Sequence, residues 1–222
     1  YIVNGMHNKD KIIPCVIGLG YVGLPIFLEL QKKFQTIGYD KKKQRVKNLS
    51  IRVDQNYEYK KKQLILKNRS FYTEKHDSFK RSNFFIICVP TPIFSNKKPD
   101  LSFIKSACMS LSKYLKKDDI VVLESTVYPG VTEDFCGQLL AKYSKLKVNK
   151  DFHLAYSPER INPGDKKHTL TNIKKITSAS NQKSLNIVDK LYNTIIPAGT
   201  YKAKSIEVAE AAKVIENTQR DI

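Results

Sequence analysis

Three glycines with the spacing of a phosphate-binding turn are the most informative chemical feature of the chain. They lie in the sequence GLGYVG at residues 18–23. Such a turn needs one bend without a Cβ, one close approach to a pyrophosphate and one tight contact between helix and strand. Gly18, Gly20 and Gly23 lie at these three places. The N–H groups at the start of the next helix would then face the pyrophosphate of a dinucleotide.

The elements around these glycines have the order that such a site requires. An apolar run at 12–17 precedes the turn, a segment of helical period follows at 24–34, and a short strand at 36–39 ends at Asp40. An acid at that point can accept hydrogen bonds from a ribose 2′-OH. The pattern predicts a βαβ unit that binds NAD, and the alternative is a glycine-rich turn without a ligand.

The rest of the chain continues this alternation of strands and helices. Buried strands are expected at 84–89, 120–126 and 152–156, with helices at 101–115 and 132–143 between them. This order predicts an α/β fold with a doubly wound, mostly parallel sheet, whose ligand groups gather at the carboxyl ends of the strands.

Other segments are shorter or less regular. The expected helices are a short one at 42–49, a basic amphipathic one at 57–67 with Leu64, Ile65 and Leu66 facing inward, one at 182–195, and a last one that Ser205 caps. Short strands are expected at 70–73, 174–177 and 200–203. The last two would extend the same sheet.

Composition favours a globular protein with a real core, because the chain has 222 residues of which 41% are hydrophobic. It contains no apolar run long enough to span a membrane and no signal peptide pattern at its start, so we expect a cytoplasmic protein. The four cysteines lack metal-ligand spacing and look like buried thiols. We expect neither a metal site nor a disulfide framework.

The net charge of +18 is compatible with an anionic partner. Its lysines are spread over most segments, and no helix interleaves basic residues with stacking aromatics. A solvated lysine-rich surface is therefore favoured over a nucleic-acid groove, and general attraction of phosphorylated ligands is the third alternative.

Five motifs together resemble the UDP-glucose/GDP-mannose dehydrogenase family. They are GLGYVGLP at 18–25, VPTP at 89–92, ESTVYPG at 124–130, SPERINPGD at 157–165 and AEAAKVIENTQRD at 209–221. The chain looks most like the branch, of the Vi-polysaccharide type, that oxidises UDP-N-acetylgalactosamine or UDP-N-acetylglucosamine for surface polysaccharides. The resemblance implies oxidation of the C6 alcohol to a carboxylate with two NAD⁺, through a thioester on a cysteine.

The resemblance also implies roles for individual residues. Thr91 and Glu159 would position and deprotonate a catalytic water, while Lys213 and Asn217 would stabilise an oxyanion and, with Glu159 and Arg160, contact the UDP-sugar. The alternatives without a catalytic role are an exposed Glu159 paired with Arg160 and a solvated Lys213. The cofactor-binding candidates are Gly18, Gly20, Tyr21, Val22, Gly23, Asp40, Val89, Thr91 and Thr126.

The resemblance places an NAD-binding Rossmann-like domain at residues 1–204 and the start of a central dimerisation helix at 205–222. The family's nucleophilic cysteine lies in a glycine-rich segment beyond that helix, which does not occur here. We therefore expect a fragment that is inactive alone, without the central and UDP-binding domains. The alternatives are a UDP-glucose 6-dehydrogenase and a non-catalytic dinucleotide- or nucleic-acid-binding module.

Overall fold

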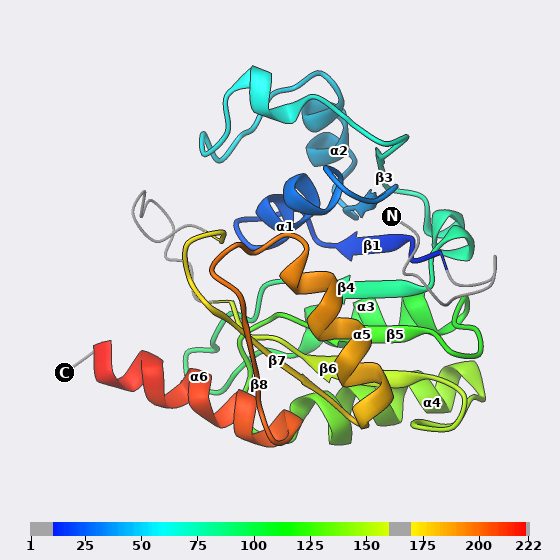
Figure 1. Cartoon of the computed structure of the whole chain (residues 1–222), viewed down its shortest axis with the longest axis vertical. Helices are drawn as coiled ribbons and strands as arrows, with labels where there is room; N and C mark the ends of the chain where they lie inside the picture. The colour runs from blue at the N-terminus through cyan, green and yellow to red at the C-terminus, as the bar shows by residue number, and fades with distance from the viewer. Residues whose placement is uncertain (1–10, 160–169, 221–222) are drawn as a thin grey trace.

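The chain folds around one twisted sheet with helices on both faces (Figure 1). The computed structural model describes residues 11–159 and 170–220. Within them the eight strands have the order β3-β2-β1-β4-β5-β6-β7-β8. The strands are β1 Pro14–Ile17, β2 Ile37–Tyr39, β3 Phe71–Thr73, β4 Phe84–Ile87, β5 Ile120–Leu123, β6 His153–Tyr156, β7 Lys175–Ala179 and β8 Thr200–Lys202. The α-helices are α1 Gly23–Leu30, α2 Lys43–Ser50, α3 Ser102–Ser112, α4 Gln138–Ser144, α5 Gln182–Asn193 and α6 Ile206–Arg220.

The predicted doubly wound, mostly parallel sheet is confirmed. The six strands β1 to β6 all pair in parallel with one another. Their order places a ligand crevice between β1 and β4. Strand β7 differs, because it pairs antiparallel with β6 and parallel with β8. The first residue of β7, rather than its last, therefore lies at the carboxyl edge of β5 and β6.

Side chains that alternate along the central strands build a core on each face of the sheet. Cys15 and Ile17 of β1 pack in one cluster with residues of α3, α4 and the start of α6. Val16 of β1 packs in the other with residues of α1, α2 and α5. Burial on both faces explains why these strands read as continuous apolar runs.

The predicted amphipathic helix at 57–67 is wrong. Only a 3₁₀ turn, Lys61–Leu64, forms there, and Tyr57 has a φ of 57°. Leu64 is buried, but Ile65 and Leu66 are exposed. The Asp54 carboxylate accepts the backbone N–H groups of three residues just after it, which holds the chain in a local turn that competes with a helix.

The predicted helix at 132–143 has two parts. A π-helical segment, Val131–Gly137, follows Gly130, whose φ is 96°, and α4 continues from Gln138. The wider π turn leaves no periodic signature in so short a sequence. A second 3₁₀ segment, His76–Arg81, precedes β4.

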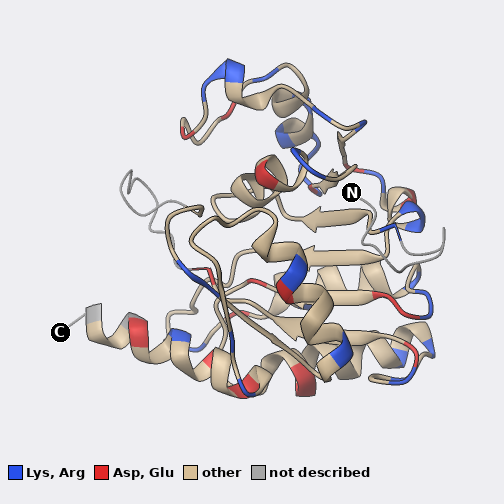
Figure 2. Ribbon diagram, in the orientation of Figure 1, with Lys and Arg blue, Asp and Glu red and all other residues tan. Residues whose placement is uncertain are grey.

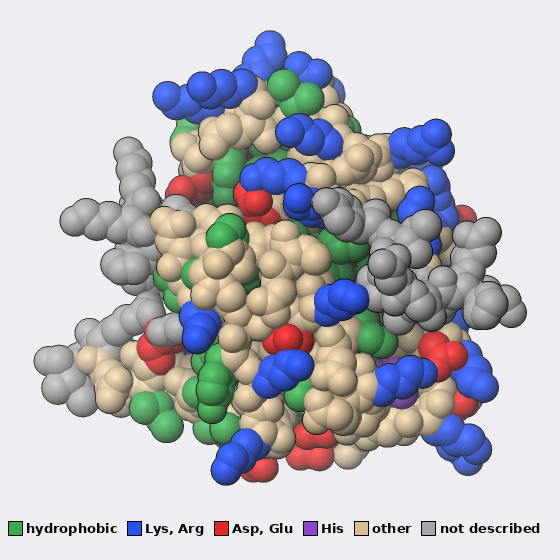
Figure 3. All heavy atoms as spheres, in the orientation of Figure 1, with side chains coloured by type: hydrophobic (Ala, Val, Ile, Leu, Met, Phe, Trp, Pro, Cys, Tyr) green, Lys and Arg blue, Asp and Glu red, His purple; other side chains and the backbone are tan. Residues whose placement is uncertain are grey.

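Lysine and arginine residues occur in most elements of the fold (Figure 2) and over much of the face seen in Figure 3. In the view of Figure 3 they are most frequent on the lobe formed by α2 and the residues before β3. Acidic residues alternate with basic ones along α5 and α6 (Figure 2). In the part of the chain that the structure describes, no helix is both long and apolar enough to cross a bilayer.

Candidate nucleotide and catalytic site

The three glycines of the turn after β1 have distinct structural environments. A Cβ on Gly18, whose φ is +96°, would lie 2.9 Å from the backbone oxygen of Cys88. A Cβ on Gly23 would lie 1.8 Å from the backbone oxygen of Gly18, so only glycine permits this contact between turn and helix. A Cβ on Gly20 would have no atom within 4 Å. Gly20 thus leaves an open space beside the start of α1.

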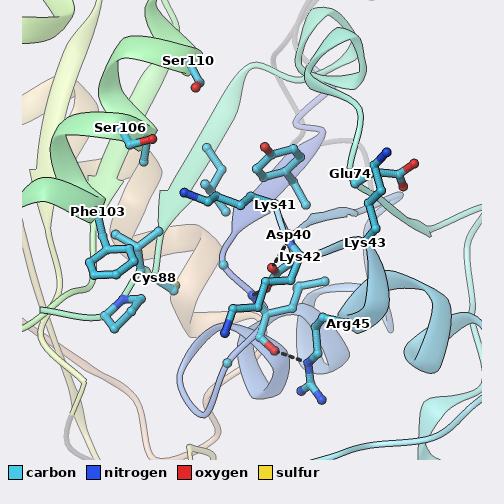
Figure 4. Close-up of a pocket in the computed structure, with 18 of the residues that line it drawn as sticks. Asp40, Lys41, Lys42, Lys43, Arg45, Glu74, Cys88, Phe103, Ser106 and Ser110 are labelled. Atoms are coloured by element: carbon cyan, nitrogen blue, oxygen red, sulfur yellow. Dashed lines mark hydrogen bonds between the residues drawn. The ribbon is translucent and has the colours of Figure 1, made fainter. Parts of the chain in front are cut away.

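That turn borders a cleft of about 590 Å³ at the carboxyl ends of β1, β2 and β4. Gly18, Gly20, Asp40 and Val89 line it, together with Arg45. Figure 4 shows Phe103 and Ser106 of α3 on one side of the cleft and Lys41 and Lys42 on the other. The cleft lies at the point where the strand order reverses, which is where doubly wound sheets bind dinucleotides.

Asp40 connects the glycine turn to the segment that leads into α2. Its Oδ2 accepts the N–H of Leu19 at 2.9 Å, and its Oδ1 accepts the N–H of Lys42 at 2.9 Å. Each carboxylate oxygen can accept a further hydrogen bond. Asp40 therefore holds the turn in shape and can also receive a ribose hydroxyl.

Arg45 is a candidate ligand that sequence reasoning missed. Its Nε donates to the backbone oxygen of Leu19 at 2.9 Å, and its Nη1 donates to Asp54 at 2.7 Å. Its Nη2 is buried without a hydrogen-bond partner in the described part of the chain, although Arg45 lines the cleft. A buried donor without a partner is costly, and a ligand oxygen would satisfy it.

The residues of the cleft fit a dinucleotide. The open space at Gly20 allows a pyrophosphate to approach the backbone, and the unpartnered Nη2 of Arg45 supplies a donor. Asp40 supplies an acceptor beside it. These are the three kinds of group that the phosphates and ribose of NAD require.

The remaining cofactor-binding candidates are not among the residues that line the cleft. Tyr21 is exposed, and Val22 directly precedes α1. Thr91 donates its hydroxyl proton to the backbone oxygen of Thr126 at 2.8 Å. The two threonines thus connect the loops that follow β4 and β5.

Glu159 lies in a buried cluster and not on an exposed loop. Its Oε2 is 3.2 Å from the Nζ of Lys175, which is 2.5 Å from Oε2 of Glu124. The hydroxyl of Tyr192 donates to the other oxygen of Glu124. All four side chains are at least nine-tenths buried. The predicted alternative of an exposed loop acid is therefore wrong.

The charges of this cluster influence one another. Burial raises the pKa of Glu124 to about 7, although Lys175 partly offsets that rise. Burial alone would lower the pKa of Lys175, but Glu124 and Glu159 outweigh it and the pKa is raised. Lys175 is therefore a stable cation between two carboxyl groups.

Lys213 and Asn217 lie one turn apart in α6. Lys213 is buried, with 6% of its surface exposed, and its Nζ lies 3.8 Å from Glu216. The alternative of a solvated lysine is therefore wrong. Arg160, the other predicted substrate contact, lies outside the described residues.

Glu210 of α6 is another functional candidate that the sequence did not reveal. Its carboxylate is fully buried and accepts the N–H of Gly130 at 2.7 Å and the N–H of Thr132 at 2.9 Å. The hydroxyl of Thr132 donates to it as well, at 2.6 Å. This anchor fixes the start of α6 to the loop that follows β5.

All four cysteines are buried free thiols. Burial raises the pKa of Cys88, the one nearest the cleft, well above its ordinary value. Thiolates are the reactive form of cysteine, so this side chain is a poor nucleophile. No group of three or more potential ligands suited to a metal ion occurs among the described residues.

The missed residues share one signal, namely a charged side chain within or beside a buried segment. Glu124 directly follows the apolar strand β5, and Lys175 opens β7. A buried charge requires a partner of opposite sign, so the two could have been paired. The pairing was not evident because the sequence does not show that β7 is antiparallel to β6.

Comparison with known proteins identifies this arrangement. Residues 11–196 match the model of the NAD-binding domain of the UDP-glucose/GDP-mannose dehydrogenase family. The chain is 51% identical, over 98% of its length, to a UDP-N-acetyl-D-glucosamine 6-dehydrogenase of Salmonella typhi. It is 50% identical, over 93% of its length, to an enzyme of the same name from Pseudomonas aeruginosa. It spans about half the length of these curated relatives (51% and 49%).

A solved structure of a similar enzyme shares this fold. A solved UDP-D-ManNAc dehydrogenase from Pyrococcus horikoshii superposes with a TM-score of 0.85 and 30% sequence identity. The superposition covers 95% of this chain and 51% of that protein. The likeness thus extends over nearly the whole of this chain.

Proposed function

Since the chain belongs to the UDP-glucose/GDP-mannose dehydrogenase family, we propose that it is the NAD-binding part of a UDP-N-acetylhexosamine 6-dehydrogenase. Such an enzyme oxidises the C6 alcohol of the sugar to a carboxylate. The observation that carries the proposal is a glycine turn that opens on a cleft suited to NAD, in a chain half identical to enzymes named for UDP-N-acetyl-D-glucosamine. The names of these relatives favour an N-acetylhexosamine over UDP-glucose.

Four residues would hold the cofactor. The backbone at Gly18 and Gly20 receives the pyrophosphate, Asp40 accepts from a ribose hydroxyl, and Arg45 donates through Nη2. When bound, NAD supplies the hydride acceptor that oxidation of an alcohol requires. Thr91 and Thr126, linked by a hydrogen bond, would border its reactive end.

The chemistry on the sugar would fall to residues at the same edge of the sheet. Glu159, assisted by Thr91, would take a proton from the attacking water. Lys213 and Asn217 would stabilise the negative oxygen that develops at C6. Lys213, Asn217, Glu159 and Arg160 would also orient the substrate.

The domain organisation belongs to the same proposal. Residues 1–204 would form the cofactor domain, and the helix that starts at 205 would continue into a dimer interface. The nucleophilic cysteine and the UDP-binding residues would belong to the other half of a longer cytoplasmic enzyme. The burial of all four thiols in this chain supports that division of labour.

Calorimetry and NADH absorbance test the proposal in two steps. The 222-residue chain should bind NAD but produce no NADH from any UDP-sugar, since it offers no accessible thiol. The full-length protein should produce two NADH per UDP-N-acetylglucosamine or UDP-N-acetylgalactosamine. Turnover by the 222-residue chain, or a full-length protein that prefers UDP-glucose, would contradict the proposal. A chain that binds DNA but no NAD would support the non-catalytic alternative.

The oxyanion roles predict a distinct kinetic pattern in the full-length enzyme. Lys213→Ala or Asn217→Ala should lower kcat by about 10²–10³ and leave NAD affinity nearly unchanged. A melting curve for each variant checks that the fold persists. Lys190→Ala, at an exposed lysine of α5, is the control and should keep the parent kcat. An unaltered kcat in both test variants would exclude the two residues from catalysis.

A further inference from the structure

The buried ammonium of Lys175 has all three of its protons directed at acceptors. Its Nζ lies 2.5 Å from Glu124 Oε2, 3.1 Å from the backbone oxygen of Pro158 and 3.2 Å from Glu159 Oε2. An ammonium has three donors, so its capacity is filled. Lys175 thus holds both the side chain of Glu159 and the backbone carbonyl group of the preceding residue, Pro158.

Reversal of β7 is what brings this lysine to the ligand edge of the sheet. Tyr156, the last residue of β6, pairs with Ser178, and Ser157 donates its hydroxyl proton to the backbone oxygen of Ile176. Three residues further in each direction, after Tyr156 and before Ser178, Glu159 and Lys175 lie opposite each other. A parallel β7 would have placed its first residue at the far edge of the sheet.

The cluster draws one group from each of four elements. Glu124 follows β5, Glu159 follows β6, Lys175 opens β7, and Tyr192 belongs to α5. The Nζ of Lys175 also lies 5.6 Å from the centre of the Tyr192 ring. Glu124 is 1% exposed and Glu159 is 7% exposed, so Glu159 is the member nearer to solvent.

Such a cluster is a poor device for stability alone. A buried ion pair gains little over a well-packed apolar substitute, because the attraction must first offset the desolvation of both charges. Here two carboxyl groups share one cation, which makes the arrangement costlier still. Its geometry is better explained by a need to fix one of the carboxylates.

We propose that Lys175 is a positioning residue that fixes the orientation and the negative charge of Glu159, and that Glu124 and Tyr192 hold Lys175 in place. The inference rests on the proposed role of Glu159 as a general base. A base must be ionised to accept a proton, and a fixed cation beside it favours that form. Lys175 acts through Glu159 and needs no contact with substrate.

The other titratable groups around the cluster do not replace Lys175. Burial raises the pKa values of Cys88, Tyr59 and Tyr156, which all interact electrostatically with Glu124 or Glu159, so these groups stay neutral near pH 7. The pKa of Glu124 is raised to about 7, so Glu124 takes up a proton as the pH falls. Lys175 is the cation that the structure places between the two acids.

The pH profile of turnover by the full-length protein tests the inference. In Lys175→Met the acid limb of kcat against pH should move up by one unit or more, and kcat near pH 7 should fall by about 10-fold or more. The KM for NAD should stay within about twofold. Lys175→Arg, which keeps the charge, should restore part of the loss. Lys202→Met is the control, because Lys202 of neighbouring β8 pairs with Asp189 at 3.4 Å and is half exposed.

The double variant Lys175→Met/Glu124→Gln separates positioning from folding. It removes the cation together with one acid, so it leaves fewer unpaired charges in the core than Lys175→Met alone. A shifted acid limb in a folded double variant supports the proposal. A limb that stays at the position found for Glu124→Gln alone, with only a lowered melting temperature, overturns it and leaves Lys175 a structural residue.

Carboxyl ¹³C titration in the 222-residue chain gives a second, turnover-independent measurement. Glu159→Gln identifies the Glu159 signal. The Glu159 pKa should be higher in the double variant than in Glu124→Gln, which differs from it only at Lys175, and equal values would overturn the proposal. A full-length parent without UDP-sugar turnover would instead refute the proposed function, while this titration would still decide whether Lys175 controls the charge of Glu159.

Discussion

The carboxylate of Asp40 performs two tasks at the mouth of the cleft. It accepts the N–H groups of Leu19 and Lys42, which fixes the glycine turn, and its charge faces the same cleft. A phosphate on the 2′ position of a ribose bound beside Asp40 would therefore meet a fixed negative charge. The flexible side chains of Lys41 and Lys42, also in the lining, oppose it only partly.

A preference for NAD over NADP follows from this arrangement. A 2′-phosphate about 4 Å from Asp40 would cost about 4 kcal/mol at a surface-like dielectric, before the lysines offset part of it. Asp40→Asn should lower the ratio of NAD to NADP affinity by about tenfold or more, as measured by calorimetry. Glu74→Gln, at another acid that lines the cleft, is the control. Tighter NADP binding by the parent chain would contradict the prediction.

Asp119 is a buried acid far from the proposed chemistry, and it makes stability depend on pH. Burial raises its pKa to about 6, although the N–H of Lys116 donates to its Oδ2. Because the folded-state pKa exceeds the ordinary value of 3.8, the folded protein holds its proton more tightly than the unfolded chain. This contribution to stability is complete below about pH 4 and is lost as the pH rises through 6.

Replacing Asp119 by Asn should therefore stabilise the protein more at pH 7.5 than at pH 4. The difference between the two pH values should reach up to about 3 kcal/mol in the free energy of unfolding, measured with urea. Asp151→Asn is the matched control, since Asp151 also accepts a backbone N–H, from Lys147, but is only partly buried. An equal effect at both pH values would show that Asp119 titrates normally.

At the scale of elements, the turn between β1 and α1 separates structural from ligand-binding glycines. Gly23→Ala should destabilise the fold by about 3 kcal/mol or more, because its Cβ meets a backbone oxygen that cannot move freely. Gly20→Ala should melt like the parent but bind NAD about tenfold more weakly, because its Cβ would fill the space for the pyrophosphate. Thermal melts and NAD titrations measure both effects. Unchanged NAD affinity in a folded Gly20→Ala protein would move the pyrophosphate elsewhere.

The sequence predicted the elements that carry periodic or apolar signals. The central strands, α1, α3 and α5 were expected within a few residues of their observed bounds, because burial on both faces or on one stripe dictates their pattern. The segment at 57–67 was misread because the acceptors that hold it come from Asp54, outside the segment. The hydrophobic pattern of a segment does not reveal a side chain outside it that competes for its backbone N–H groups.

The candidate site was predictable in part for the same reason. The glycines and Asp40 lie within one βαβ unit, so their spacing alone indicates a nucleotide site. Arg45, Glu124 and Lys175 gain their surroundings from tertiary contacts. In particular, Lys175 reaches the site through the direction of β7, which depends on pairing with β6 and not on the residues of β7 themselves.

At the scale of the whole molecule, the basic residues that give the net charge of +18 occur in most elements of the fold (Figure 2). Between 50 and 200 mM salt, NAD affinity should fall by less than about tenfold, whereas a groove with 6–10 phosphate contacts would lose about 10³–10⁵ in affinity for DNA. Fluorescence anisotropy with a labelled duplex, beside NAD calorimetry at each salt concentration, measures both. Submicromolar DNA binding at 150 mM salt would revive the nucleic-acid alternative.

The four buried cysteines make the native chain almost inert to thiol reagents. Burial raises the pKa values of Cys15 and Cys88, and a hydrogen bond with Cys108 together with burial raises that of Cys136, so these side chains provide few thiolates at neutral pH. A cysteine placed at Tyr201, which is 59% exposed on β8, would then be labelled selectively by a maleimide dye without removal of any native cysteine. A single fluorescent label can therefore be attached to the protein while all four native cysteines stay in place.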